Sequence, residues 1–162
     1  MFPIPDNRDH PVSTETSQIQ PNDVPNRSKR PPSAIRSGLY VVATPIGNLG
    51  DLTKRAEEIL ASATLIACED TRVTGKLLAK RGITSRMLAY HDHSPPSVRH
   101  DLIRRLKDGE IVALVSDAGT PLVSDPGYKL VAAALEAGLY VTAAPGPASP
   151  MAALVLSGLP SD

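Results

Sequence analysis

The chain has 162 residues, equal numbers of acidic and basic side chains, and a single cysteine, Cys68. The length suits one domain, and one cysteine excludes both a disulfide framework and a cysteine-based metal site. The zero formal net charge excludes a broad basic field for nucleic acid, so RNA binding would require a local patch. No apolar run approaches the roughly 18 residues of a membrane-spanning helix, and we expect a protein of the reducing cytoplasm with no membrane partner.

Residues 1–36 hold seven of the sixteen prolines and few large apolar side chains. Such a segment cannot bury enough surface to offset the entropy that it would lose on ordering. It lacks the apolar core of a signal peptide, and its acidic residues argue against a transit peptide. We therefore predict a disordered, proline-rich extension over residues 1–37 and an α/β domain over residues 38–162.

From Gly38 onward, short apolar runs alternate with segments of helical spacing. The strand-like runs cover residues 39–43, 64–68, 86–90, 111–116 and 139–144. The helix-like segments cover residues 51–63, 71–82, 97–109, 127–138 and 148–158. This alternation predicts an α/β fold, with a mainly parallel five-stranded sheet and helices on both of its faces.

The loops that follow the expected strands carry the residues with special chemistry. They read TPIGNLGD, EDTR, HDHSPP, SDAGTPLVSDPG and PGPAS, whereas the loops before the strands, such as DGE and AGL, are short and plain. In open parallel sheets, ligands bind outside the carboxyl ends of the strands. The sequence therefore predicts a ligand site at that edge of the sheet.

The loop over residues 116–127 restricts its backbone most strongly, because its prolines fix φ and its glycines permit positive φ. Asp117 follows a buried strand, where no local role accounts for its carboxylate, so we expect it to face a ligand. Asp125 is typical of a helix N-cap, with Pro126 at the first helical position, and we predict that structural role for it.

Phosphate-binding motifs are missing from these loops. The sequence has no GxxxxGK[ST] motif and no GxGxxG motif after its first expected strand, which excludes a P-loop and a dinucleotide site. The segment 144–154 instead combines a stiff Pro-Gly-Pro turn with two small residues, Ala148 and Ser149, that open a helix. The N–H groups at such a helix start are available to a ligand.

His91, Asp92 and His93 follow the third expected strand. Consecutive residues of an extended chain do not point at one centre, so we expect no metal site there. A contact with the substrate or a proton transfer is the more plausible role for these three side chains.

Two charged segments have ordinary structural interpretations. Asp70 or Thr71 is expected to cap the helix that follows, while Glu69 pairs with Arg72. The basic segment RRLK, residues 104–107, is interpreted as a solvated helix face in preference to an RNA-binding patch.

Several of these motifs, in this order and spacing, resemble the bacterial ribosomal RNA small subunit methyltransferase I family, within the tetrapyrrole methylase superfamily. The resemblance covers nearly all of the chain from Leu39 onward. The matching segments are VATPIGNLGDLT (42–53), CEDTR (68–72), HDHS (91–94), SDAGTPLVSDPG (116–127) and SGLPSD (157–162). The block at 116–127 is long and specific.

The resemblance implies methyl transfer from S-adenosylmethionine to the ribose 2′-hydroxyl of a cytidine in the decoding region of 16S rRNA. It also implies a cofactor cleft between two α/β domains and a homodimer. The residues that would border the cofactor by this resemblance are Pro45, Ser116, Asp117, Ala118, Gly119, Pro121, Pro147, Ala148 and Ser149.

The sequence departs from the family pattern in three ways. PGPAS replaces PGPSA, which removes a hydroxyl at Ala148, and Ser94 replaces the asparagine of HDHN. Family members also continue past SGLPSD into a second domain. We therefore expect the 162-residue chain to be the N-terminal domain, with weak or absent methyl transfer by itself.

The reaction requires an aligned acceptor and is helped by a base, because a ribose hydroxyl is a poor nucleophile. The candidate bases are His91, Asp92 and His93, and Glu69 and Asp70 stay open as alternatives. Two other functions are also open: methylation of a corrin or porphyrin precursor, and a domain that binds a cofactor or partner without turnover. The first loop lacks the GxGxGD-like pattern usual in the tetrapyrrole enzymes, which favours RNA.

Overall fold

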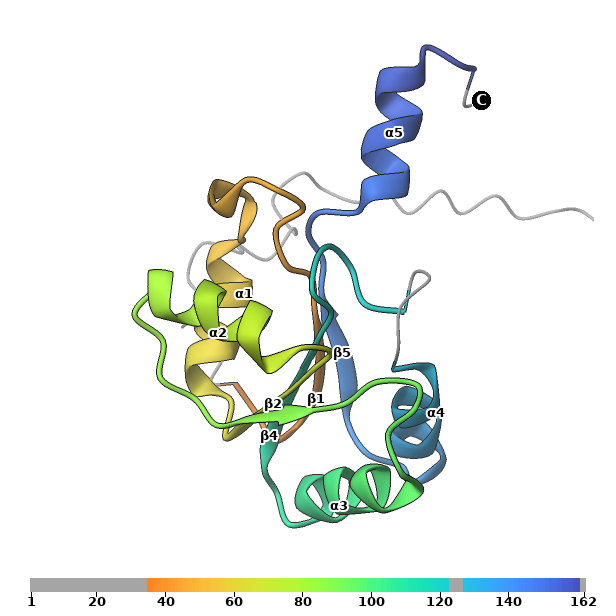
Figure 1. Ribbon diagram of the computed structural model, residues 1–162. Coiled ribbons are helices and arrows are strands. Elements are labelled where there is room, and N and C mark those ends of the chain that lie inside the picture. The colour runs from red at the N-terminus through yellow and green to blue at the C-terminus, as the bar shows by residue number, and fades with distance from the viewer. Residues whose placement is uncertain (1–34, 123–126, 161–162) are drawn as a thin grey trace, which may run out of the picture. The chain divides into compact units, whose positions relative to one another are not determined.

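Five apolar runs form one parallel sheet in the computed structural model, which describes residues 35–122 and 127–160 (Figure 1). The strands are β1 (Gly38–Val42), β2 (Leu65–Cys68), β3 (Met87–Ala89), β4 (Ile111–Val115) and β5 (Val141–Ala144). Their order is β3-β2-β4-β1-β5, and every neighbouring pair is parallel. The predicted α/β class with a five-stranded parallel sheet is confirmed.

Helices alternate with these strands along the described part of the chain. They are α1 (Lys54–Ser62), α2 (Thr71–Lys80), α3 (Pro96–Lys107), α4 (Tyr128–Glu136) and α5 (Ser149–Ser157). A 3-10 turn, η2 (Leu49–Asp51), precedes α1 and replaces the start of the helix expected over residues 51–63. The helix begins later because the Thr53 side chain caps it, accepting from the Ala56 N–H at 3.1 Å.

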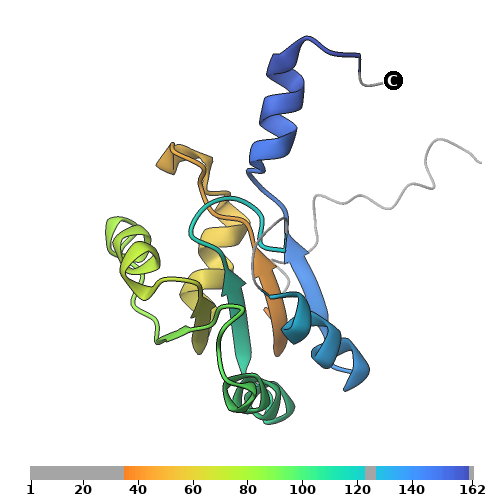
Figure 2. The same ribbon diagram turned by 45° about the vertical axis from the view of Figure 1, so that its right-hand side comes forward.

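Both faces of the sheet are covered. Figures 1 and 2 show α1 and α2 on one face, with α3 and α4 on the other. Along β1 the side chains alternate, since Tyr40 and Val42 pack with α1 and α2 while Leu39 and Val41 pack with α3 and α4. This two-sided burial explains why the strands read as continuous apolar runs and not as alternating ones.

The order of the strands creates a switch point between β1 and β4. The chain moves from β1 past β4 to β2 and then to β3, reverses to reach β4, and passes β1 to reach β5. Consequently the loops after the neighbouring strands β1 and β4 leave toward opposite faces. A crevice at such a point is where open α/β sheets bind ligands.

The predicted start of α4 is wrong. Asp125 was expected to cap this helix with Pro126 at its first position, but the N-cap is Gly127 and the helix begins at Tyr128. Gly127 has a φ of 127°, which is incompatible with a helical residue and prevents the helix from extending backward. Asp125 and Pro126 themselves lie outside the described residues.

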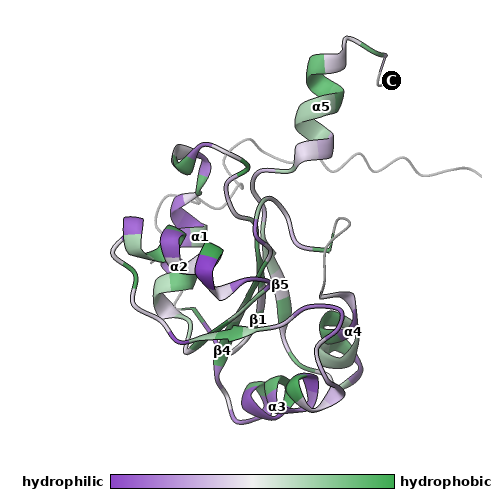
Figure 3. Cartoon of the chain, in the orientation of Figure 1, coloured by the Kyte–Doolittle hydropathy of each residue, from purple (hydrophilic) through white to green (hydrophobic). Residues whose placement is uncertain are grey.

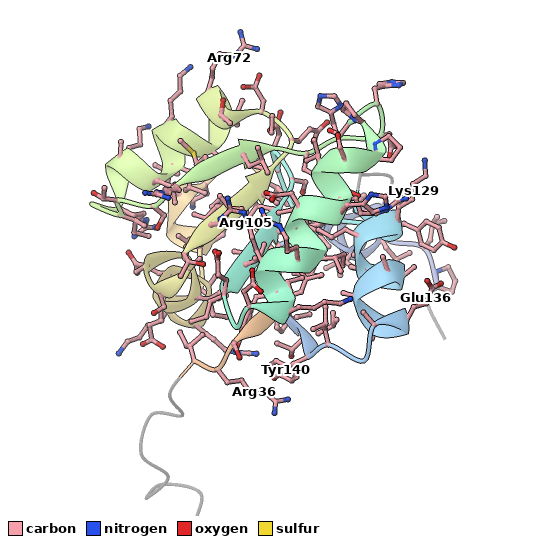
Figure 4. The ribbon with its side chains drawn as sticks, turned by 90° about the horizontal axis from the view of Figure 1, so that it is seen from below. Arg36, Arg72, Arg105, Lys129, Glu136 and Tyr140 are labelled. Carbon is pink, nitrogen blue, oxygen red and sulfur yellow. The ribbon has the colours of Figure 1, made fainter. Side chains whose placement is uncertain are left out.

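The predicted N-terminal extension, residues 1–37, falls almost entirely outside the described residues. Its last three residues are described, and there Ile35 packs against the core on the α1 side of the sheet. The Arg36 guanidinium lies 3.2 Å from the centre of the Tyr140 ring (Figure 4). The Arg36 carbonyl accepts from the Tyr40 hydroxyl at 2.8 Å. The fold is therefore anchored a few residues before β1.

Helix α5 differs from the other four helices described, because none of its residues is buried. Its surface is apolar on most sides (Figure 3), and Val155 and Leu156 are 78% and 85% exposed. Among the helices in residues 35–122 and 127–160, none has the length and apolar character needed to cross a membrane.

Candidate functional site

The loops after β1 and β4 are joined directly across the switch point. Thr44 and Gly119 exchange two backbone hydrogen bonds, of 2.8 and 3.1 Å. The buried Thr44 hydroxyl also donates to the Ser116 carbonyl at 3.2 Å. These bonds connect the start of the loop after β4 to the loop after β1.

A second bond ties the loop after β4 to the loop after β5. The Thr120 hydroxyl donates to the Pro147 carbonyl at 2.9 Å. Gly119 has a φ of 88°, and a Cβ added to it would lie 3.3 Å from Cγ2 of Ile46 and 3.7 Å from the Pro147 carbonyl oxygen. The three loops therefore meet around a position that only glycine occupies without strain.

Two cavities flank this junction. The first, called here the α2 cavity, has a volume of about 310 Å³ and lies between α2 and the loops after β1 and β4. Its wall includes Pro45, Asp117 and Ala118, three of the nine predicted cofactor residues, together with Lys76 and Lys80 of α2.

The second, called here the α5 cavity, has a volume of about 600 Å³ and lies between α5 and the loop after β1. Two more predicted residues, Pro147 and Ala148, line it together with Ile46 and Met151. Five of the nine predicted cofactor residues are thus divided between these two cavities.

The remaining predicted cofactor residues line neither of these two cavities. Ser116 is 2% exposed, and Gly119 and Pro121 are also buried. Their burial is consistent with a role in shaping the loop. Ser149 is exposed at the first position of α5, beyond the wall of the α5 cavity.

Asp117 has a structural partner that the sequence did not indicate. Its Oδ1 accepts from the Asp70 N–H at 3.1 Å, which joins the loops after β2 and β4. The carboxylate nevertheless remains exposed and lines the α2 cavity. A structural role and a ligand contact are therefore compatible at this residue.

Asp70 caps α2, as one of the two predicted alternatives proposed. Its Oδ1 accepts from the Arg72 N–H at 2.8 Å, and its Oδ2 lies 2.5 Å from Nη2 of Arg72. The Arg72 guanidinium and N–H stabilise the carboxylate and lower the pKa of Asp70 to about 2. The predicted Glu69–Arg72 pair is wrong, because the capping carboxylate lies closer to the guanidinium.

The single cysteine takes no part in the site. Cys68 is buried at the end of β2, where its Sγ lies 3.7 Å from the Leu88 carbonyl. Burial raises the pKa of its thiol, so the nucleophilic thiolate is disfavoured.

The loop with His91, Asp92 and His93 lies at the carboxyl end of the edge strand β3. His91 and Asp92 line a cavity of about 80 Å³ that shares no residue with the α2 or α5 cavities. The rings of His91 and His93 are 6.3 Å apart. Because β2 separates β3 from β4, this loop is two strand spacings, about 10 Å, from the loop after β4.

The two histidines of this loop are exposed, as is Asp92. Across the described residues, no three His, Cys, Asp or Glu side chains gather in a way that would hold a metal ion. The backbone N–H of His91 donates to the Ser94 hydroxyl at 2.9 Å, which closes the turn.

Residues 38–162 match the family model described as tetrapyrrole (corrin/porphyrin) methylases. The chain belongs to this family. It is 55% identical over 132 residues to the ribosomal RNA small subunit methyltransferase I of Mesorhizobium japonicum, an alignment that covers 82% of the chain and 45% of that protein. The chain thus spans about half the length of the curated relatives it matches, and the predicted resemblance is confirmed.

Solved structures of the family share the fold. A uroporphyrin-III C-methyltransferase from Thermus thermophilus superposes with a TM-score of 0.59 at 25% identity, covering 78% of this chain and 54% of that chain. A structure of the same enzyme with S-adenyl homocysteine superposes with a TM-score of 0.52 at 25% identity, covering 76% and 49%.

Sequence reasoning missed three parts of this site. Thr44 gave no signal, because its partner Gly119 is distant in sequence. Ile46 was not among the predicted site residues, although it lies in the loop TPIGNLGD and lines the α5 cavity. Lys76 and Lys80 do carry a signal, since residues four apart share one helix face, but their cavity exists only once α2 is placed beside the loop after β1.

Proposed function

We propose that this chain takes part in S-adenosylmethionine-dependent methylation of a cytidine ribose 2′-hydroxyl in the decoding region of 16S rRNA. The observation that carries the proposal is the 55% identity to a ribosomal RNA small subunit methyltransferase I. The sequence identity to the uroporphyrin-III enzyme is lower, at 25%, although the fold is shared. The ribosomal small subunit would be the partner and the cytoplasm the location, and the active form would be a homodimer.

The residues around the α5 cavity suit a cofactor with an adenosyl group. Its volume of about 600 Å³ is within the range of small-molecule sites, and Ile46, Pro147 and Met151 give it apolar walls. Asp51 and Thr53 add polar groups at its edge. The S-adenyl homocysteine bound in the Thermus structure supports S-adenosylmethionine as the ligand.

We assign the cofactor contacts to the residues that the family resemblance indicates. Pro147 and Ala148 would face it from the α5 cavity, and Pro45, Asp117 and Ala118 from the α2 cavity. Ser116, Gly119, Pro121 and Ser149 would act through the backbone or by shaping the loops. S-adenosylmethionine, when bound, supplies a methyl group on a positively charged sulfur. The sulfur is a good leaving group because it departs as a neutral thioether.

The chain's own residues would align the acceptor and accept its proton. His91, Asp92 and His93 are the proposed base loop, because all three are exposed at the carboxyl edge of the sheet. Asp70 is the weaker alternative, since a carboxyl with a pKa of about 2 is a poor base near neutral pH. Glu69 stays open.

Calorimetry with S-adenosylmethionine tests the cofactor half of the proposal. Binding by the 162-residue chain is expected to be weak, because by family resemblance the cleft uses a second domain. We expect little or no methyl transfer to small ribosomal subunits by the same chain. Robust turnover by the purified chain would contradict that expectation.

Mass spectrometry of 16S rRNA from cells with and without the gene tests the substrate half. The expected result is loss of one ribose methylation. Alanine substitutions at His91, Asp92 and His93 in the full-length enzyme are expected to lower the rate, and unchanged methylation by all three would remove this loop as the base.

A second candidate is a methyltransferase for a corrin or porphyrin precursor, favoured by the structural similarity to the uroporphyrin-III enzyme. Unchanged methylation of 16S rRNA together with altered tetrapyrrole levels in the deletion strain would favour it. A third candidate is a domain that binds the cofactor or a partner without turnover. This third candidate predicts that the cofactor binds but that neither 16S rRNA nor a tetrapyrrole is methylated.

A further inference from the structure

Helix α2 carries a row of basic side chains. Arg72, Lys76 and Lys80 are spaced four residues apart, and the helix contains no acidic residue. Residues four apart share one helix face, and a rise of 1.5 Å per residue makes this row about 12 Å long. The row therefore offers a line of positive charges, not a single one.

Two members of the row lie at the α2 cavity, where proposed cofactor residues form another part of the wall. Lys76 and Lys80 line this cavity opposite Pro45 and Asp117. Both lysines are exposed, and no carboxylate of the described residues lies within ion-pair distance of either. Arg72, which is labelled in Figure 4, lies at the exposed start of the row and pairs with Asp70.

In the RRLK segment, residues 104–107, two of the three basic side chains are paired with carboxylates. Arg104 and Arg105 of α3 both pair with Asp101, and Arg105, which is labelled in Figure 4, also pairs with Glu110 at 3.2 Å. This segment also lies on the opposite face of the sheet from α2. Lys76 and Lys80 of α2, by contrast, make no ion pair with a described residue.

We propose that Lys76 and Lys80 bind consecutive phosphodiester groups of the single-stranded RNA that flanks the methylated ribose. This inference rests on the proposed function. Lysine is a compact, flexible point charge that suits phosphate, and a row of charges matches a polyanion better than it matches one carboxylate. Val73 and Leu77 lie in the same wall and give an apolar surface for a base.

The test is the salt dependence of RNA binding by the full 162-residue chain. Fluorescence anisotropy would follow a labelled single-stranded RNA with the decoding-region sequence, between about 50 and 200 mM salt. For K76Q/K80Q we expect the slope of log affinity against log salt to fall by about 1.4, and the affinity at low salt to fall about tenfold or more.

The matched control is R86Q/K107Q. It removes the same two charges, but Arg86 lies just before β3 and Lys107 ends α3, so both lie toward the amino edge of the sheet, away from the cavities. This control is expected to keep the wild-type slope and affinity. Circular dichroism melting of both variants checks that the fold is kept, which we expect because all four side chains are exposed.

Three results would overturn the inference. Equal slopes for K76Q/K80Q and wild type would place the phosphates elsewhere and leave the proposed function standing. Equal losses in both variants would mean that binding follows net charge alone. No binding by the wild-type chain at low salt would also reject it for this chain, whereas the cofactor half of the proposed function is judged separately by calorimetry.

Discussion

Thr44 and Gly119 exchange two backbone hydrogen bonds across the switch point, although 75 residues separate them. The pair holds the loop after β1 against the loop after β4, and Thr120 continues the connection to Pro147. The three loops that face the two cavities are therefore one bonded unit. A change at their junction should affect stability and ligand binding together.

Gly119→Ala is the direct test of this junction. Alanine at a φ of 88° is strained by about 1–2 kcal/mol, and its Cβ would in addition crowd Ile46. We expect a lower free energy of unfolding in urea and weaker binding of S-adenosylmethionine.

Gly82→Ala is the matched control, because Gly82 has a φ of 66° and no heavy atom within 4 Å of an added Cβ. It should lose only the strain contribution and keep cofactor binding. If the two variants lose the same stability and both keep binding, the junction has no special role.

Asp70 gives a prediction about pH. Its folded pKa of about 2 lies below the ordinary value of 3.8, so the folded state holds the carboxylate more strongly than the unfolded chain does. The stabilisation is fully present above pH 4 and is lost as the pH falls toward 2. Urea denaturation at several pH values in this window should show the decline.

Asp70→Asn separates the charge from the cap, because asparagine is also a good N-cap. The variant should be less stable than wild type at neutral pH, and the difference should shrink as the pH falls from 4 to 2. A difference that stays constant over this window would show that Asp70 does not titrate as the Arg72 contact indicates.

The strands were predictable because buried strands appear in the sequence as short runs of apolar residues. Val112, Ala113 and Leu114 are at most 1% exposed, so a run of apolar residues with no polar alternation was enough to identify β4. Strand order was not predictable in the same way. It depends on which strands pair across loops and helices, and no local pattern records that choice.

In the candidate site, too, features set by local sequence were predictable and features set by distant contacts were not. Loops rich in proline, glycine, aspartate or histidine led to the prediction of a site at the carboxyl edge, and the parallel sheet gathers these loops at that edge. The start of α4 was mistaken because Asp-Pro-Gly fits two helix starts, and the positive φ of Gly127 decides between them. Lys76 and Lys80 were overlooked because their surroundings come from distant loops.

The contrast between α3 and α5 gives a prediction about stability. Leu102 of α3 is 0% exposed within the core, so Leu102→Ala should lower the free energy of unfolding by about 2–5 kcal/mol. Leu156 of α5 is 85% exposed, so Leu156→Asp should change it by less than about 0.5 kcal/mol. Urea denaturation of both variants measures the two effects.

The α5 result is informative because leucine to aspartate is normally severe wherever the side chain is covered. A loss above about 1 kcal/mol for Leu156→Asp in the 162-residue chain would mean that α5 packs against something in solution, since a buried, unpaired carboxylate is costly. Repeating the measurement over a range of protein concentrations would then show what packs against α5. Dependence on concentration indicates a second copy of the chain, and independence indicates contact within one copy.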